Sequence, residues 1–250
     1  MTQPIDITMV TWNRPEFTYL SLQSIKQNTA YPHKVIVIDN GSEKEMQQRL
    51  LDFKREGWID TLVLLDFNRG LEYAKNIAMS FVESSFFIST DNDLIAFRYD
   101  PCWLTKLVDL MNNNPEYAAI ACRPQILVGT GNIFDGKTDE IIEFSHVPGY
   151  LRIMRTDLTR QIGAWDEKRP MRGHEEIWSS ERFRAMGYRV GWANYVECWH
   201  LFGNENDWGY TGLTPNQHGH NEVSSLPHDD WDIIKNKANI TKWENALEQI

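Results

Sequence analysis

Short apolar stretches alternate with helical patterns through the first hundred residues, and each apolar stretch ends in a polar turn. Four stretches have the length and composition of buried strands, at 5–11, 35–38, 61–65 and 86–90. The segments between them carry apolar residues at helical spacing, as Leu20, Leu22 and Ile25 illustrate. The alternation predicts an α/β fold with a mostly parallel, doubly wound central sheet, right-handed crossovers and helices on both faces.

The second half of the chain is less regular. Further strands are expected at 118–122, 126–128, 150–155 and 189–192, and helices at 103–110, 156–162 and 174–186. In the first half, Ser42 and Glu45 have the spacing of a capping box at the start of the second helix.

Two carboxylates follow the fourth predicted strand where it leaves the sheet. Asp91-Asn92-Asp93 comes directly after the stretch at 86–90, and α/β sheets bind ligands outside the carboxyl ends of their strands. Two acidic side chains one residue apart can share a divalent cation and leave coordination positions for a substrate phosphate. Asp and Asn also stabilise turns through their own backbone, so these three residues alone fit either a metal site or a structural turn.

Composition narrows the class of protein. The 250 residues carry a formal net charge of −10, which opposes non-specific binding to nucleic acid or to anionic lipid because both need a positive surface. An acidic protein that handles an anionic nucleotide would need a metal or a few local cations at the site. This requirement agrees with the acidic pair after the fourth strand.

Targeting signals and a cysteine framework are not apparent in the sequence. No apolar run approaches the roughly 20 residues that span a bilayer, and the first residues lack the basic and apolar regions of a signal peptide. Cys102, Cys122 and Cys198 are widely spaced and odd in number, as expected of reduced core thiols. We therefore expect a cytoplasmic protein of one domain.

Six motifs in order carry a resemblance to a known family. They are Met9-Val10-Thr11-Trp12-Asn13-Arg14, Val37-Ile38-Asp39-Asn40-Gly41-Ser42, Asn68-Arg69-Gly70 with Ala74-Lys75-Asn76, Asp91-Asn92-Asp93, Gly163-Ala164-Trp165-Asp166-Glu167 with Gly173-His174-Glu175-Glu176, and Trp199-His200. In this order the chain resembles the inverting glycosyltransferases of family two, which have the GT-A fold, from about residue 5 to residue 200. Lys75 stands where the family usually has Arg.

The resemblance implies transfer of a sugar from a nucleotide diphosphate donor to an acceptor hydroxyl, with a metal at the donor diphosphate. Asp93 is then the principal metal ligand, and Asp91 reaches the donor sugar or ribose while remaining a second candidate ligand. His200 falls where the family often supplies a metal-binding histidine. An imidazole ligand favours Mn²⁺ over Mg²⁺.

Glu175 and Glu176 are the candidates for the catalytic base. An acceptor hydroxyl needs a carboxylate near the anomeric carbon to take its proton during attack. In the family the second acidic residue of this pair is the base and is usually Asp, so the resemblance favours Glu176. Adjacent glutamates at a helix start also occur simply because they complement the helix dipole.

The resemblance also places a donor site around the ends of the first four strands. The expected donor-binding residues are Thr11, Asn13, Arg14, Asp39, Asn68, Gly70, Lys75, Asp91 and Asn92. Asp39 would accept the imide proton of uracil, which favours a UDP-sugar, with a deoxythymidine donor next. Asp39 followed by Asn40-Gly41 also suits a simple turn after a buried strand.

The acceptor is expected to be a glycan, a glycolipid or another hydroxyl compound. A modified nucleobase stays open, although the acidic charge disfavours nucleic acid. The chain lacks a Gln-x-x-Arg-Trp element, which indicates single transfers rather than processive synthesis. The expected single GT-A domain divides into a nucleotide-sugar half at 1–100, an acceptor and catalytic half at 101–202, and a lid with C-terminal helices at 203–250.

Three other classes of protein compete with this interpretation. A nucleotidyltransferase would need a Gly-rich basic loop after the first strand, and a metal-dependent phosphatase would need its acidic residue there. The acidic pair instead follows the fourth strand. A non-catalytic sugar-nucleotide or glycan-binding relative would not need Asp93, Glu176 and His200 together.

Overall fold

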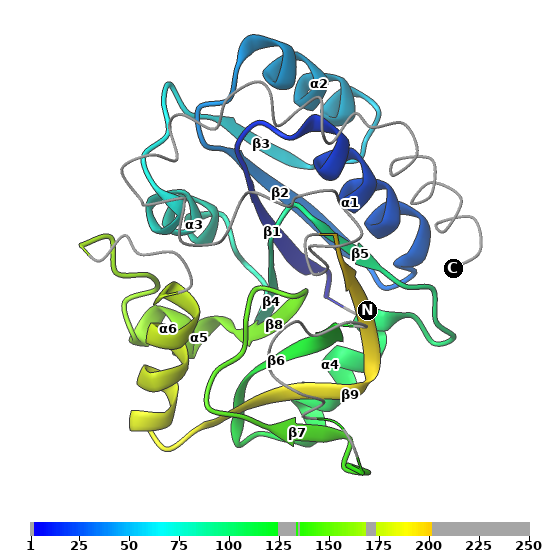
Figure 1. The fold of residues 1–250 in the computed structure, drawn as a ribbon, viewed down its shortest axis with the longest axis vertical. Coiled ribbons are helices and arrows are strands. Elements are labelled where there is room, and N and C mark those ends of the chain that lie inside the picture. The colour runs from blue at the N-terminus through cyan, green and yellow to red at the C-terminus, as the bar shows by residue number, and fades with distance from the viewer. Residues whose placement is uncertain (1–2, 125–133, 135, 169–173, 202–250) are drawn as a thin grey trace, which may run out of the picture.

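The structure is a computed structural model that describes residues 3–124, 134, 136–168 and 174–201. In chain order its elements are β1 (Ile5–Thr11), α1 (Pro15–Asn28), β2 (His33–Asp39), α2 (Lys44–Arg55), β3 (Thr61–Leu64), α3 (Leu71–Ser80), β4 (Phe86–Thr90), β5 (Leu94–Ala96), α4 (Trp103–Asn113), β6 (Tyr117–Pro124), β7 (Ile141–Glu143), β8 (Arg152–Arg155), α5 (Thr156–Gln161), α6 (His174–Ala185) and β9 (Arg189–His200). Figure 1 shows their arrangement. No helix in the described ranges is long and apolar enough to cross a membrane.

The nine strands in the described residues form one sheet. Eight of them follow the order β3-β2-β1-β4-β8-β6-β9-β5, and β7 lies off this path beside β9. β7 pairs with the start of β9, and β5 pairs with its end. The strands from both halves of the chain therefore share one continuous sheet, with β4 and β8 at the junction.

The α/β class is as predicted, but the sheet is mixed rather than mostly parallel. β3, β2, β1 and β4 are parallel to one another, whereas β8 runs antiparallel to both β4 and β6. Four of the eight strand pairings in the described chain are antiparallel. The described part of the connection between β6 and β8 holds β7 and no helix, and neighbouring strands joined without a crossover helix run antiparallel.

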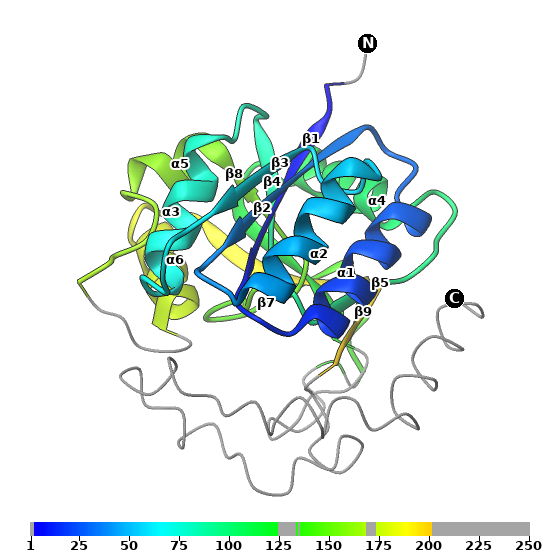
Figure 2. The same ribbon diagram turned by 90° about the horizontal axis from the view of Figure 1, so that it is seen from above.

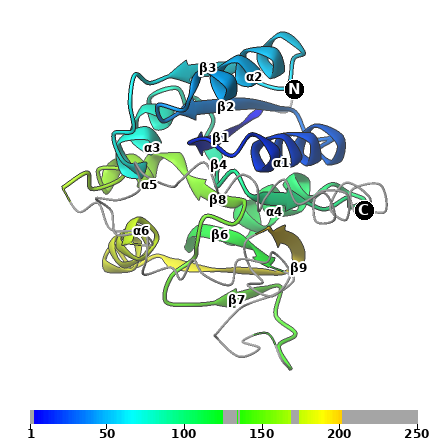
Figure 3. The ribbon, with the colours of Figure 1, turned by 45° about the horizontal axis from the view of Figure 1, so that its top comes forward.

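Helices cover both faces of the sheet, as predicted (Figures 2 and 3). One core lies between the sheet and α1, α2 and α4, and includes Leu22, Leu50 and Leu107. The other lies between the sheet and α3, α5 and α6, and includes Ala78, Leu158 and Phe183. The central strands contribute alternate side chains to the two cores, as Ile36 and Val37 on β2 illustrate.

Strands from both halves of the chain end or begin at the same side of the sheet, where the parallel strands have their carboxyl ends; we refer to this side as one edge of the sheet. The parallel register sets Thr11 beside Asp39 and Met9 beside Thr90, so β1, β2 and β4 end together. β8 begins at this edge because Arg152 pairs with Ser89 on the antiparallel strand β4. β9 is parallel to β6 and ends at the same edge, which carries the candidate site.

Several local predictions differ from the structure. β5 was not predicted, and β9 extends to His200 instead of ending at 192. The capping box is wrong: the N-cap residue of α2 is Glu43, with no side-chain cap. Ser42 instead hydrogen-bonds the Asp39 carboxylate. The strand predicted at 126–128 and the lid and helices predicted at 203–250 lie outside the described residues.

Candidate active site

Asp91-Asn92-Asp93 forms the turn between β4 and β5. Asn92 is buried, and its Nδ2 donates to the hydroxyls of Thr11 and Thr18 at 3.1 and 3.0 Å. These bonds tie the turn to the end of β1 and to α1. The structure therefore gives Asn92 and Thr11 a role in holding the turn, which adds to the donor contact expected of each.

Asp93 faces a cation and an imidazole. Its Oδ2 lies 3.6 Å from Arg14 Nη1, and its Oδ1 lies 3.6 Å from His200 Nε2. Asn13 and Arg14 adopt left-handed backbone, with φ of 52° and 59°. That conformation costs non-glycine residues about 1 kcal/mol each and is typical of functional loops. The strained loop brings Arg14 to the carboxylate.

Asp93 and His200 fit a site for one divalent cation. Neighbouring ligands of an octahedral ion about 2.1 Å away lie about 3 Å apart, near the 3.6 Å between these two side chains. Among the described residues no group of three or more His, Cys, Asp or Glu side chains could hold a metal. Asp91 is directed elsewhere, to Lys75 and Gly149. A two-residue site leaves most coordination positions for phosphate oxygens and water.

Two buried cations neutralise the acidic side chains next to Asp93. Lys75 Nζ lies 3.2 Å from Glu175 Oε1 and 3.8 Å from Asp91 Oδ1. Arg152, fully buried on β8, donates from Nη1 to Val147 O at 2.8 Å. Burial raises the pKa of Glu175, but the charges of Lys75 and Arg152 outweigh it and hold that pKa below its usual range. Glu175 is therefore a carboxylate engaged in an ion pair.

Glu176 has a different environment from its neighbour. Its side chain is half-buried, and its Oε1 accepts the Gly149 N–H at 2.6 Å. Burial, with the charges of Glu175 and Asp91, raises the pKa of Glu176 to about 8. A pKa near the working pH suits a general base. The environment thus distinguishes Glu176, with its raised pKa, from Glu175, whose pKa is lowered.

The other predicted donor residues lie in the loops after β1, β2 and β3. Asp39 is buried, and its Oδ2 accepts from Ser42 N at 3.0 Å and Gln47 Nε2 at 3.2 Å. Burial raises the pKa of Asp39 despite these bonds. Here Asp39 closes the turn after β2.

Asn68 and Gly70 belong to a second set of loop contacts. Asn68 Oδ1 accepts from Asn40 Nδ2 and from Gly70 N, each at 2.9 Å. The adjoining turn passes so close that a Cβ on Gly41 would lie 2.2 Å from the backbone of Phe67. Asn13, in the loop after β1, contacts the loop after β2: its Oδ1 accepts the Glu43 N–H at 3.0 Å. The predicted donor loops are therefore packed against one another at the sheet edge.

Sequence reasoning missed three residues at the site: Gly149, Tyr150 and Arg152. Gly149 contacts both Asp91 and Glu176, and the Tyr150 ring lies 4.7 Å from the His200 ring. Arg152 offered a usable signal, because a charge among Leu151, Ile153 and Met154 in a buried strand needs an acidic partner.

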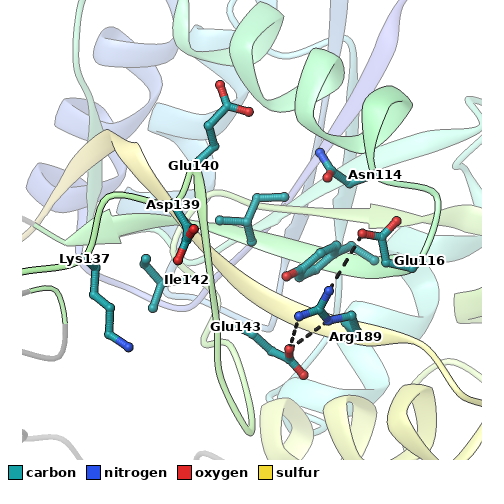
Figure 4. A pocket seen from close by; sticks show the side chains of 10 residues that line it. Asn114, Glu116, Lys137, Asp139, Glu140, Ile142, Glu143 and Arg189 are labelled. Carbon is teal, nitrogen blue, oxygen red and sulfur yellow. Dashed lines mark hydrogen bonds and ion pairs between the residues drawn. The ribbon is translucent and has the colours of Figure 1, made fainter.

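A polar hollow of about 450 Å³ lies at the opposite edge of the sheet (Figure 4). Its lining includes Tyr117 and Arg189, the first residues of β6 and β9, and Arg189 pairs there with Glu116 and Glu143. None of the predicted site residues lines it. The candidate chemistry belongs to the edge where Asp93 and Glu176 lie.

A curated relative, the glucosyl-dolichyl phosphate glucuronosyltransferase of Haloferax volcanii, is 27% identical over 120 residues, 46% of this chain. The match spans 36% of the relative's own length.

Two solved structures share the fold. A structure of GalNAc-T7 with UDP, GalNAc and Mn²⁺ matches 81% of this chain and 44% of its own, at 14% identity and a TM-score of 0.65. The mannosyltransferase PcManGT from Pyrobaculum calidifontis, with GDP-Man and Mn²⁺, matches 98% and 74%, at 16% identity and a TM-score of 0.62. The fold is therefore the GT-A fold of glycosyltransferases.

The sequence comparison with protein families shows which family the chain belongs to. Residues 6–172 match the family described as glycosyl transferase family 2. This span, about two thirds of the chain, includes the Asp91-Asn92-Asp93 turn, Lys75 and the Gly149 segment. The chain belongs to glycosyl transferase family 2.

Proposed function

We propose that this protein transfers a sugar from a UDP-sugar to an acceptor hydroxyl, with inversion at the anomeric carbon and one transfer per encounter. One observation carries the proposal: Asp93 with His200, and Glu176 with Asp91, lie at the same edge of the sheet and are joined through Gly149 and Tyr150. A transferase needs its leaving-group site and its base within one substrate's reach.

The leaving group is a nucleoside diphosphate, which departs with negative charge. Asp93 and His200 would hold Mn²⁺, or Mg²⁺, while Asp91 is directed to Lys75 and Gly149. When bound, the metal supplies positive charge to the phosphate oxygens as the bond to the sugar breaks. Arg14, 3.6 Å from Asp93, would add a fixed cation on the same side. The Mn²⁺ in the structures of GalNAc-T7 and PcManGT supports this assignment.

Glu176 acts as the base in this proposal. The acceptor oxygen forms its bond to the anomeric carbon while the bond from that carbon to the diphosphate oxygen breaks, and the hydroxyl proton passes to the Glu176 carboxylate. Attack opposite the leaving group gives a β-linked product from an α-linked donor. The ion pair with Lys75 keeps the adjacent Glu175 ionised, so Glu175 does not take the acceptor proton in this proposal.

The proposed donor site is the group of packed loops at the ends of β1, β2 and β3. Asp39, Asn68 and Lys75 are the proposed contacts to base, ribose and donor sugar. UDP is the first choice because Asp39 can accept the uracil imide proton. The relatives bind different nucleotides, since the PcManGT structure contains GDP-Man and the GalNAc-T7 structure contains UDP. The donor test therefore includes both.

A donor panel tests the proposed function. The purified chain with Mn²⁺ would be incubated with UDP-, GDP- and dTDP-sugars, with and without glycan, glycolipid and other hydroxyl acceptors, and nucleotide release would be measured. We expect metal-dependent release of UDP that an acceptor accelerates, and a β-linkage in the product by NMR. The absence of release with every donor would instead support a non-catalytic binding relative.

A further inference from the structure

The segment from Val147 to Tyr150 contacts both functional parts of the candidate site. The Gly149 N–H donates to Glu176 Oε1 at 2.6 Å, and the Gly149 carbonyl accepts the Asp91 N–H at 3.3 Å. The segment is anchored at Val147, whose N–H donates to Ser180 Oγ at 3.3 Å and whose carbonyl accepts from Arg152. One short segment therefore joins α6, β8 and the turn after β4.

Gly149 is needed here for space. A Cβ at this position would lie 3.0 and 3.1 Å from the two Asp91 carboxylate oxygens. The backbone of Gly149 is not left-handed, so the conformation itself would accept an alanine. These contacts are tighter than ordinary van der Waals contacts, so a side chain here requires a shift of a few tenths of an ångström between Asp91 and Gly149, next to the N–H that holds Glu176.

Tyr150, the next residue, packs against His200, the candidate metal ligand. Its ring centroid lies 4.7 Å from that of His200, at an interplanar angle of 39°, and 5.9 Å from the ring of Trp192. The packing restricts the rotation of the imidazole that faces Asp93. Burial and the charges of Glu176, Asp93 and Asp91 raise the pKa of Tyr150, because its hydroxyl lies near all three carboxylates.

We propose that Gly149 and Tyr150 are positioning residues that fix the base and the metal site relative to each other. Gly149 orients Glu176 through its N–H, and Tyr150 orients His200 through its ring. The proposal rests on the proposed function, in which Glu176 is the base and His200 a metal ligand. Groups that orient a metal ligand strongly affect metal affinity, and small displacements of a reacting group strongly affect rate.

The first arm of the test is Gly149→Ala. Because the added methyl group displaces the N–H on Glu176 but leaves Asp93 and His200 in place, we expect kcat to fall about tenfold or more while the donor KM changes less than about threefold. The control is Ile59→Val, in the connection between α2 and β3, which removes a methylene from the core beneath α1, α2 and α4 and should leave both constants unchanged. A wild-type kcat in Gly149→Ala would overturn the role of Gly149.

The second arm compares Tyr150→Leu with Tyr150→Phe. Manganese would be titrated into the protein saturated with UDP, and its binding followed by tryptophan fluorescence, which needs no turnover. Loss of the ring in the leucine variant should weaken Mn²⁺ binding about tenfold, and phenylalanine, which keeps the ring, should retain the affinity. Equal affinity in the leucine variant and the wild type would overturn the role of Tyr150.

These results separate the proposal from the function on which it rests. If the wild-type chain neither binds UDP with Mn²⁺ nor releases nucleotide from any donor, the proposed function fails and the positioning roles fail with it. If the wild type is active and both Gly149→Ala and Tyr150→Leu behave like it, only the positioning roles fail. The two arms use different residues and different readouts, so misfolding of one variant leaves the other arm decisive.

Discussion

Lys75 on α3 and Glu175 on α6 form a buried ion pair, with Nζ 3.2 Å from Oε1. The pair joins two helices on the same face of the sheet. It gives Glu175, the first of the two adjacent glutamates, a structural partner. The second, Glu176, has no such cation within ion-pair distance among the described residues and takes its hydrogen bond from Gly149. The pair therefore separates a structural carboxylate from the proposed base.

Removal of Lys75 should destabilise the fold. Lys75→Met leaves the buried Glu175 carboxylate without its cation, and loss of one partner of a buried pair costs about 3–5 kcal/mol. The double variant Lys75→Met/Glu175→Met should recover most of that loss, because it removes the uncompensated charge. Urea unfolding of the wild type, both single variants and the double variant measures the coupling. Additive losses would show that the two side chains do not interact.

Asp93→Ala should abolish nucleotide-dependent stabilisation. A ligand at one hundred times its Kd stabilises the folded state by about 2.7 kcal/mol, which for a chain of this size is a Tm increase of roughly 5–10 °C. We expect the wild type with UDP and Mn²⁺ to show this shift, and Asp93→Ala to show none. Asp109→Ala, on the exposed side of α4, is the matched control and should keep it. A full shift in Asp93→Ala would remove Asp93 from the metal site.

The rate should depend on pH through Glu176. Its pKa is raised to about 8, so the protonated form persists through neutral pH and the base form accumulates only as the pH approaches 8. We expect kcat/KM to rise about tenfold per unit between roughly pH 6 and pH 7 and to level off only above about pH 8. A profile that is already flat above pH 5 would indicate a base with an ordinary carboxylate pKa.

The first half of the fold could be predicted from residue patterns because its strands and helices alternate regularly. The strand at 86–90 and the acidic turn after it appear where they were expected. The second half was harder because β8 runs antiparallel to β4 and β6 with no helix in the described connection after β6, and because β5 has only three residues. Short antiparallel strands leave a weak periodic signal.

The sequence indicated which residues form the candidate site, but it did not indicate the contacts that those residues make. Asp93 and His200 lie together, as expected of a shared metal site. The capping box was wrong because the Ser42 hydroxyl bonds the Asp39 carboxylate, a tertiary competition that local spacing does not show. Gly149 went unnoticed because its importance comes from the space next to Asp91, which only the folded chain shows.

The role of Glu176 as the base is tested by the turnover of Glu176→Gln at matched donor occupancy. With the donor found in the panel, Mn²⁺ and acceptor all saturating, nucleotide release by wild type and variant would be compared after donor binding has been measured in both. We expect unchanged donor affinity and a loss of transfer of at least about a hundredfold, as for removal of a general base. Transfer at the wild-type rate in Glu176→Gln would show that another group takes the acceptor proton.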